Sequence, residues 1–115
     1  MNKDCLFCKI VSKEIQTKIE YENDVVVAIN DISPQAPTHI LILPKLHIPT
    51  INDLRNNEDI IIGAMFNAAK KIAKMRNFYK EGYRTVINCN KDAGQTVFHI
   101  HLHLLAGRPL QWPPG

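Results

Sequence analysis

The chain has 115 residues, a length that suits one domain and is too short for two. Hydrophobic residues make up 45% and charged residues 22%, which is typical of a globular protein and excludes a disordered chain. The formal net charge of +3 is scattered along the sequence, so we expect a small anionic ligand and no nucleic acid. We predict a single domain over residues 1–115, with residues 106–115 as a C-terminal tail.

The sequence also indicates the compartment. No apolar run approaches the roughly 20 residues of a membrane-spanning helix, and the first residues lack the apolar core of a secretory signal. The three cysteines, Cys5, Cys8 and Cys89, favour free thiols or metal binding over disulfides in a reducing compartment. We therefore expect a cytoplasmic protein, with the nucleus as a second location, and no membrane partner.

The first half of the chain predicts one short helix and three strands. Residues 4–15 place apolar side chains on one side of a helix that Asp4 can cap. The β-branched stretches 18–21 and 25–30 flank a polar turn and predict a hairpin. Two prolines make the following loop, up to residue 37, rigid. Residues 39–44 are almost continuously apolar, which predicts a strand buried on both faces.

The second half predicts the main helix and two more strands. Apolar residues recur every three or four positions between residues 57 and 76, which is typical of a helix that packs on a core. Residues 83–88 and 97–105 are predicted strands, joined by a loop over residues 90–95. Strands interrupted by one long helix predict an α+β domain with an antiparallel sheet. We expect a five-stranded meander with the helices on one face.

Three histidines occupy alternate positions of the last predicted strand. Because side chains alternate across a sheet, His99, His101 and His103 share one face. The residues on the opposite face are apolar: Phe98, Ile100, Leu102 and Leu104. We expect the main helix to cover the apolar face and the histidines to line a cleft. Chance clustering on a half-exposed strand is the less favoured interpretation, which leaves nucleophilic or acid–base catalysis and metal binding by a His-x-His pair.

The histidine strand carries a family resemblance. Residues 99–105 read His-x-His-x-His followed by two apolar residues. Residues 31–39 (Asp-Ile-Ser-Pro-Gln-Ala-Pro-Thr-His), 94–97 (Gly-Gln-Thr-Val) and 112–115 (Trp-Pro-Pro-Gly) accompany this motif. Over essentially its whole length the chain resembles the histidine triad (HIT) superfamily and, within it, the histidine triad nucleotide-binding (HINT-like) branch. The resemblance implies a HIT-like fold, with a five-stranded antiparallel sheet, one long and one short helix, and a homodimer across which the sheet extends.

The implied activity is hydrolysis of purine nucleoside 5′-phosphoramidates and related AMP or GMP conjugates, with no cofactor required for the chemistry. By the resemblance, His101 attacks the α-phosphorus and forms a nucleotidyl-histidine intermediate. This reaction requires a neutral imidazole with a free attacking nitrogen. The other ring nitrogen must then donate to a fixed acceptor, for which a backbone carbonyl of the same strand is a candidate.

The resemblance also implies the remaining catalytic roles. Donors should surround the phosphoryl oxygens, and His103, Gln95 and the backbone amides around Thr96 are expected to supply them. The Thr96 hydroxyl is expected near the leaving group, to which it can pass a proton. Gly94 allows the loop to approach the phosphate. His39 is expected beside the nucleophile, where it supports the orientation of that ring.

Nucleoside binding is assigned to a polar and an apolar group of residues. Asp31 is expected to accept hydrogen bonds from both ribose hydroxyls, although a turn or capping role explains it equally well. Asn88 is a candidate for phosphate or ribose, with backbone support as the alternative. Val97 belongs to the same nucleotide-binding loop as Gln95. The apolar slot for the base is expected to comprise residues that could also be plain core: Leu6, Phe7, Ile10, Ile29 and Ile32.

Cys5 and Cys8 have the spacing that lets two thiolates reach one tetrahedral zinc ion, although a single such pair favours free thiols. Zinc-containing members of the superfamily look similar at four positions of this chain, which makes Cys5, Cys8, His47 and His99 a candidate structural zinc site. Many HINT-like relatives with the Trp-Pro-Pro-Gly ending lack the cysteine pair, so the chain departs from that branch here.

Two other functions stay open from the sequence. A nucleotide-binding or scaffold protein would use the same cleft without turnover. A mononuclear zinc hydrolase would use His99 and His101 as ligands. Residues 94–96 favour the phosphoramidase over the zinc hydrolase because they supply phosphate-binding parts. The resemblance further implies that the tail over residues 107–115 lies beside the active site of the partner subunit.

Overall fold

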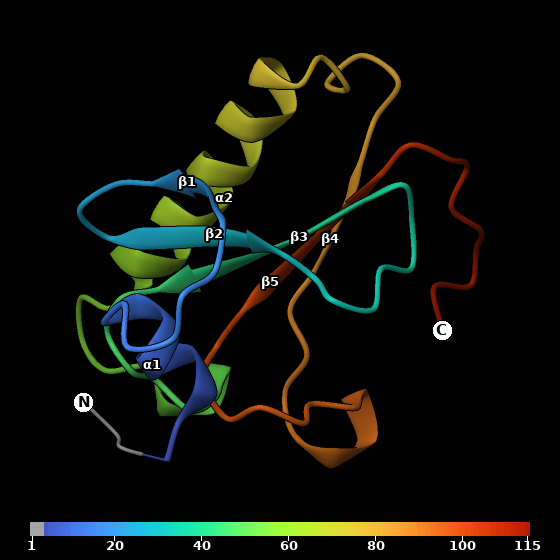
Figure 1. The fold of residues 1–115 in the computed structure, drawn as a ribbon. Coiled ribbons are helices and arrows are strands. Elements are labelled where there is room, and N and C mark those ends of the chain that lie inside the picture. Colours follow the sequence, from blue (N-terminus) through green and yellow to red (C-terminus); the bar gives the residue numbers. More distant parts are fainter. Residues whose placement is uncertain (1–3) are drawn as a thin grey trace.

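The structure is a computed structural model that describes residues 4–115, so residues 1–3 of the expected domain lie outside the described part. The helices and strands follow one another along the chain (Figure 1): α1 (Leu6–Val11), β1 (Ile19–Glu22), β2 (Val26–Asn30), β3 (Thr38–Pro44), α2 (Asp59–Met75), β4 (Arg84–Val86) and β5 (Leu102–Ala106). Two short 3-10 turns, Ile51–Asp53 and Lys91–Ala93, lie between them. None of the described helices is long and apolar enough to cross a membrane. The predicted α+β class is confirmed.

The strands form an antiparallel sheet in the order β1-β2-β3-β5-β4. The expected meander is therefore wrong, because β5 inserts between β3 and β4. After β3 the chain crosses the sheet through α2 and places β4 at the far edge, which leaves a position beside β3 that β5 fills. Leu41 of β3 and Val86 of β4 both pair with His103 of β5. The histidine strand thus lies in the interior of the sheet.

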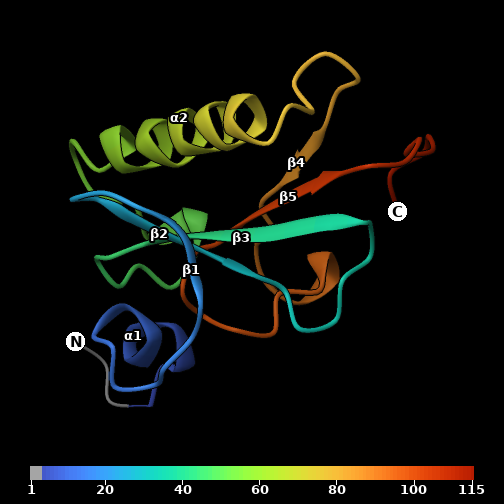
Figure 2. The same ribbon diagram turned by 45° about the horizontal axis from the view of Figure 1, so that its top comes forward.

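The two helices cover opposite faces of the sheet, as Figure 2 shows, so the expectation that both pack on one face is also wrong. The strands have apolar residues on both faces, and each face needs a cover. Along β3, Ile40 and Ile42 pack in the α2 core, whereas Leu41 and Leu43 pack in the α1 core. Burial of β3 on both faces follows the prediction. Apolar burial stabilises by about 25 cal/mol per Å². Each helix therefore stabilises the fold by removing the apolar side chains of one face of the sheet from water.

The helices differ in how well the sequence predicts their ends. α2 begins and ends within two residues of its expected bounds, because its apolar periodicity is long and regular. α1 is shorter than the expected helix over residues 4–15, since Lys13 adopts a positive φ of 66° just after the C-cap Ser12. Cys5, not Asp4, is the N-cap, and its sulfur accepts a hydrogen bond from the backbone of Cys8.

β5 is shorter than the predicted strand over residues 97–105, because regular pairing begins only at Leu102. Before this point Ile100 donates its backbone N–H to the carbonyl of Ile48 instead of to a neighbouring strand. The alternation of side chains nevertheless persists, since Ile100, Leu102 and Leu104 all pack in the α2 core.

Phe98 does not join them and is 49% exposed, which corrects its expected place on the covered face. Ala106, expected in the tail, is the buried last residue of β5.

Candidate active site

His101 is held by the backbone of its own segment. Its Nδ1 lies 2.8 Å from the carbonyl oxygen of His99. A carbonyl oxygen only accepts, so Nδ1 carries a hydrogen, and a ring with a single hydrogen then keeps its lone pair on Nε2. The ring of Phe7, from α1, packs edge-on against His101 with the centroids 5.0 Å apart. The expected acceptor for the nucleophile is thus present.

The Nε2 atom of His101 is the one that solvent can reach. Nδ1 holds the only hydrogen bond that the ring makes to the described residues. In the part of the chain that the structure describes, no buried side-chain nitrogen or oxygen lacks a partner. Since His101 as a whole is buried and Nε2 has no partner, Nε2 must be the part of the ring that opens to solvent. A neutral imidazole with an accessible lone pair is what a nucleophile requires.

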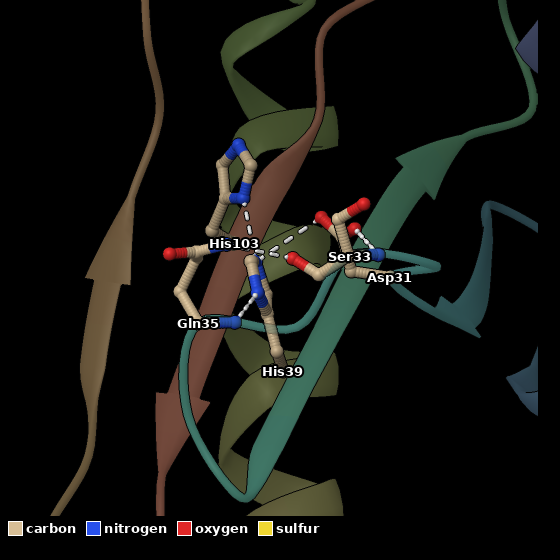
Figure 3. Close-up of polar contacts among 5 residues, drawn as sticks. All are labelled: Asp31, Ser33, Gln35, His39 and His103. Atoms are coloured by element: carbon tan, nitrogen blue, oxygen red, sulfur yellow. Dashed lines mark hydrogen bonds and ion pairs between the residues drawn. The ribbon is translucent and has the colours of Figure 1, made fainter.

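His103 and His39 form the second half of the site, shown in Figure 3. Nδ1 of His103 lies 2.9 Å from Nε2 of His39, and the His103 and His101 rings are 5.0 Å apart. Asp31 approaches Nε2 of His39 at 3.4 Å and accepts a hydrogen bond from the backbone N–H of Ser33. Burial lowers the pKa of His103 to about 4 and lowers that of His39, so both rings are neutral at pH 7. His39 therefore contacts His103, whereas we expected it beside the nucleophile.

The side-chain donors of Gln95 are used within the protein, which corrects its expected role as a phosphate donor. Its amide nitrogen donates to the carbonyls of Pro49 and Val97, at 2.8 and 3.1 Å, and its oxygen accepts from the backbone of Asn90. Both hydrogens of the amide are therefore used, and the side chain is only 6% exposed. Gln95 ties the loop before the triad to the segment after β3. It shapes the loop whose backbone precedes the histidines.

The other residues of the loop are open to solvent. Gly94 has a positive φ of 83°, a conformation that glycine adopts without strain, and Thr96 is exposed. Thr96 and Val97 line a cavity of about 270 Å³ together with Leu6 of α1. Asn88 is half-buried and lies two residues after the end of β4. These positions are compatible with the roles that the resemblance implies.

The residues expected to form the base slot fall into two groups. Phe7, Ile10 and Ile29 are buried in the core between α1 and the sheet, as the alternative assignment to the core allowed. Leu6 is 47% exposed and Ile32 is 99% exposed. Only these last two offer substantial free apolar surface to a ligand.

The four expected metal ligands come together beside the triad. Nδ1 of His99 lies 3.4 and 3.5 Å from the sulfurs of Cys5 and Cys8, and Nδ1 of His47 lies 3.2 Å from both the Cys8 sulfur and Nδ1 of His99. Zinc bonds of about 2.3 Å to sulfur and 2.0 Å to nitrogen place tetrahedral ligand atoms roughly 3.3 to 3.8 Å apart. Nε2 of His99 faces the carbonyl of Pro44 at 2.8 Å and so carries the hydrogen, which leaves its Nδ1 lone pair for the cluster. The donor set and spacing fit a closed zinc site.

Two groups of this site have no side-chain signal in the sequence. The backbone N–H of Gln35 donates to Nδ1 of His39 at 3.0 Å, and the Pro44 carbonyl accepts from His99. Backbone groups are present at every position, so residue type does not reveal them. The turn chemistry of the two prolines that flank Gln35 and Ala36 is the only hint that this backbone is fixed.

A five-stranded antiparallel sheet with three alternating histidines, the middle one held by a carbonyl and open at Nε2, defines a histidine triad site. The HIT domain family matches residues 12–110, and the chain belongs to this family.

Individual relatives agree with this assignment. The purine nucleoside phosphoramidase of Escherichia coli K12 is 48% identical over 110 residues, which cover 96% of this chain and 92% of that protein. A HIT family hydrolase from Legionella pneumophila Philadelphia 1 superposes with a TM-score of 0.94 at 48% identity, covering 97% of this chain and all of the other. A histidine triad protein from Clostridium difficile gives a TM-score of 0.94 at 42% identity, with 96% of each chain covered.

Proposed function

We propose that the chain is a purine nucleoside phosphoramidase that works through a covalent nucleotidyl intermediate on His101. The observation that carries this proposal is the hydrogen bond from Nδ1 of His101 to the carbonyl of His99, which leaves Nε2 free to attack. The 48% identity to the phosphoramidase of E. coli, across nearly the whole of both chains, supports the substrate class.

The proposed reaction has two steps. In the first, the Nε2 lone pair of His101 bonds to the α-phosphorus while the bond from phosphorus to the amine breaks. The amine leaves with a proton, for which the exposed Thr96 hydroxyl is the proposed donor. In the second, water adds to phosphorus and the bond to His101 breaks, which releases a nucleoside 5′-monophosphate and a proton that restores the Thr96 hydroxyl. His103 presents a hydrogen-bond donor to the oxygens on which charge develops.

A turnover assay tests this function. We expect the purified protein to convert adenosine 5′-phosphoramidate to AMP and ammonia, followed by ³¹P NMR, with repeated turnovers for each subunit. A protein that binds AMP in a calorimeter but releases no AMP from the phosphoramidate would instead be the binding or scaffold protein that uses the same cleft.

The contacts of the two histidines do not favour a mononuclear zinc hydrolase. Such an enzyme would need the rings of His99 and His101 to share one metal ion. Nδ1 of His99 faces the cysteine sulfurs, whereas Nδ1 of His101 faces a carbonyl oxygen. The rings of His99 and His101 therefore have different surroundings, which does not suit two ligands of one metal ion.

We also propose that Cys5, Cys8, His47 and His99 hold a structural zinc ion. The four ligand atoms lie within 4.8 Å of one another, and three of the four residues are buried. Four protein ligands leave no open position, so such an ion would connect α1 to the segment before β5 and take no part in the chemistry. Metal analysis of the purified protein should find about one zinc per chain.

We propose a homodimer, supported by two exposed features. β4 forms one edge of the sheet, and an unpaired edge needs a cover. Apolar residues are exposed on α2 and just after it: Phe66, Met75, Tyr79 and Tyr83. Light scattering should give a mass near twice 13.1 kDa. A monomer at micromolar concentration would contradict the dimer. We further propose the cytoplasm as the compartment, because a zinc site that uses Cys5 and Cys8 needs surroundings that keep cysteines reduced.

A further inference from the structure

We propose that His39 is a positioning residue that fixes the hydrogen of His103 on Nε2, and that the backbone N–H of Gln35 sets this arrangement. The inference rests on the proposed function, in which His103 donates to the phosphoryl group. As a result His101 and His103, two neighbouring imidazoles, are held in opposite tautomers, one with a free lone pair and the other with a donor at the same ring position. Figure 3 shows the residues that act on His103.

The chain of hydrogen bonds begins at a group that can only donate. The backbone N–H of Gln35 points at Nδ1 of His39 across 3.0 Å. Nδ1 of His39 must therefore be an acceptor, which means that it carries no hydrogen. A doubly protonated His39 would set two N–H groups against each other, so the same contact also opposes the charged ring.

The hydrogen of the neutral His39 ring must then lie on Nε2. His39 is 6% exposed, and burial lowers its pKa, which agrees with a neutral ring at pH 7. Nε2 has two acceptors within reach, Nδ1 of His103 at 2.9 Å and a carboxylate oxygen of Asp31 at 3.4 Å. The shorter contact lies within normal hydrogen-bond range, whereas the longer one exceeds it.

Only one arrangement of His103 agrees with this donor. If His103 carried its hydrogen on Nδ1, two N–H groups would face each other across 2.9 Å. Nδ1 of His103 must therefore accept, and its single hydrogen lies on Nε2. Burial lowers the pKa of His103 to about 4, so the ring stays neutral and the tautomer is defined. His103 Nε2 has no partner among the described residues, which leaves its N–H available to a ligand.

The rings of His101 and His103, whose centroids are 5.0 Å apart, therefore have different roles. A backbone carbonyl holds the hydrogen of His101 on Nδ1, whereas a backbone amide, acting through His39, holds that of His103 on Nε2. His101 thus presents a lone pair for attack, and His103 presents a donor for a non-bridging oxygen. A donor placed before the reaction needs no reorganisation as charge develops.

Nitrogen NMR on the free protein tests the inference directly. Long-range ¹H–¹⁵N correlation spectra of the ¹⁵N-labelled wild type should show His103 as the Nε2–H tautomer and His101 as the Nδ1–H tautomer at neutral pH. A His103 ring with its hydrogen on Nδ1, or an even mixture of the two forms, would overturn the proposal. This measurement involves no substrate, so it tests the tautomer assignment independently of the phosphoramidase function.

Two substitutions at His39 separate the donor from general packing. His39→Gln can place an amide N–H near the position of Nε2, whereas the shorter side chain in His39→Asn cannot reach it. We expect His103 to remain the Nε2–H tautomer in His39→Gln and to become a mixture in His39→Asn. We expect kcat to fall at least about tenfold in His39→Asn, with KM within about threefold, and to be largely restored in His39→Gln. Equal spectra and equal kcat in the two variants would contradict the assigned role.

A pair of variants at Gln35 tests the origin of the order without changing either histidine. Gln35→Pro removes the backbone N–H, whereas Gln35→Ala keeps it and removes only the side chain, whose amide bonds the carbonyl of Ser33. We expect tautomer mixing at His39 and His103 in Gln35→Pro and wild-type spectra in Gln35→Ala. Wild-type spectra in a folded Gln35→Pro protein would show that the amide does not set the tautomer. Normal spectra with no phosphoramidate turnover would leave the tautomer assignment intact and reject the proposed function.

Discussion

On one side of His101, the Nδ1 atom of His99 faces two buried cysteine sulfurs and a second imidazole. On the other side, His103 contacts His39, which in turn lies 3.4 Å from the carboxylate of Asp31. Both clusters use histidine on the same segment, and burial lowers the pKa of His99 and His103 to about 4. The difference lies in the partners. Thiolates and imidazole lone pairs that converge on one point suit a metal ion. A chain of hydrogen-bond donors and acceptors instead fixes which ring nitrogen carries the hydrogen. Histidine side chains on one segment thus suit metal binding at one end and catalysis at the other.

The largest effect should come from the residue between the two clusters. We expect His101→Ala to lower kcat for adenosine phosphoramidate by at least about 10⁴-fold, because among the described residues no other imidazole has a ring nitrogen placed to attack. The circular dichroism spectrum should match the wild type, which shows that the loss is chemical. A variant that retains more than a tenth of the wild-type rate would remove the nucleophile assignment.

The sulfur-containing cluster should contribute mainly to stability. We expect Cys8→Ser to lose the bound zinc and at least about 2 kcal/mol of unfolding free energy, because metal binding to the folded state adds to its stability. Cys89→Ser is the matched control, since Cys89 is a half-buried free thiol outside the cluster. Urea unfolding and zinc analysis check both variants. One zinc per chain in both variants would mean that Cys8 is not a ligand, and no zinc in either would mean that the cluster does not bind the metal.

The stability of the loop before the triad should depend on Gln95. Gln95→Ala leaves two carbonyls and one amide without their partner, which we expect to cost about 1 to 3 kcal/mol of unfolding free energy. Gln111→Ala, an exposed position in the tail, serves as control. If Gln95→Ala instead kept wild-type stability but lost phosphate affinity, the side chain would face the ligand and the internal contacts would be unimportant.

The smallest effect should be a pH dependence from the second cluster. The pKa of His103 falls from 6.5 to about 4 on burial, so the unfolded chain binds more protons between these values. Stability from the neutral ring is therefore complete above pH 6.5 and is lost as the pH falls toward 4. Between about pH 7 and about pH 4.5, we expect His103→Gln to lose less unfolding free energy than wild type, by on the order of 1 kcal/mol. Equal losses in both proteins would contradict the neutral, buried ring.

Much of the fold and site could be predicted from the sequence because both depend on periodic patterns. The spacing of apolar residues located α2 to within two residues, and strand alternation placed the three histidines opposite Ile100, Leu102 and Leu104. The two-residue spacing of the cysteines allows a metal-binding pair but by itself favours free thiols. The resemblance, not the spacing, implied the set with His47 and His99 that the fold brings together.

Other features could not be predicted because they depend on contacts between distant segments. Strand order is one, since nothing local shows that β5 inserts beside β3. Gln95 is another, because a glutamine next to a glycine in a phosphate-binding motif suggests a ligand, whereas its real partners are carbonyls such as that of Pro49. The amide of Gln35 is a third, because a backbone group has no residue type from which to recognise it.

Rapid quenching of the wild-type protein with adenosine 5′-phosphoramidate, followed by intact-mass spectrometry and peptide mapping, tests the central claim most directly. The proposed nucleophilic role of His101 predicts a transient mass increase equal to one adenylyl group, mapped to His101 and absent in His101→Ala. Turnover without any adduct at early times, or an adduct on a residue other than His101, would contradict it.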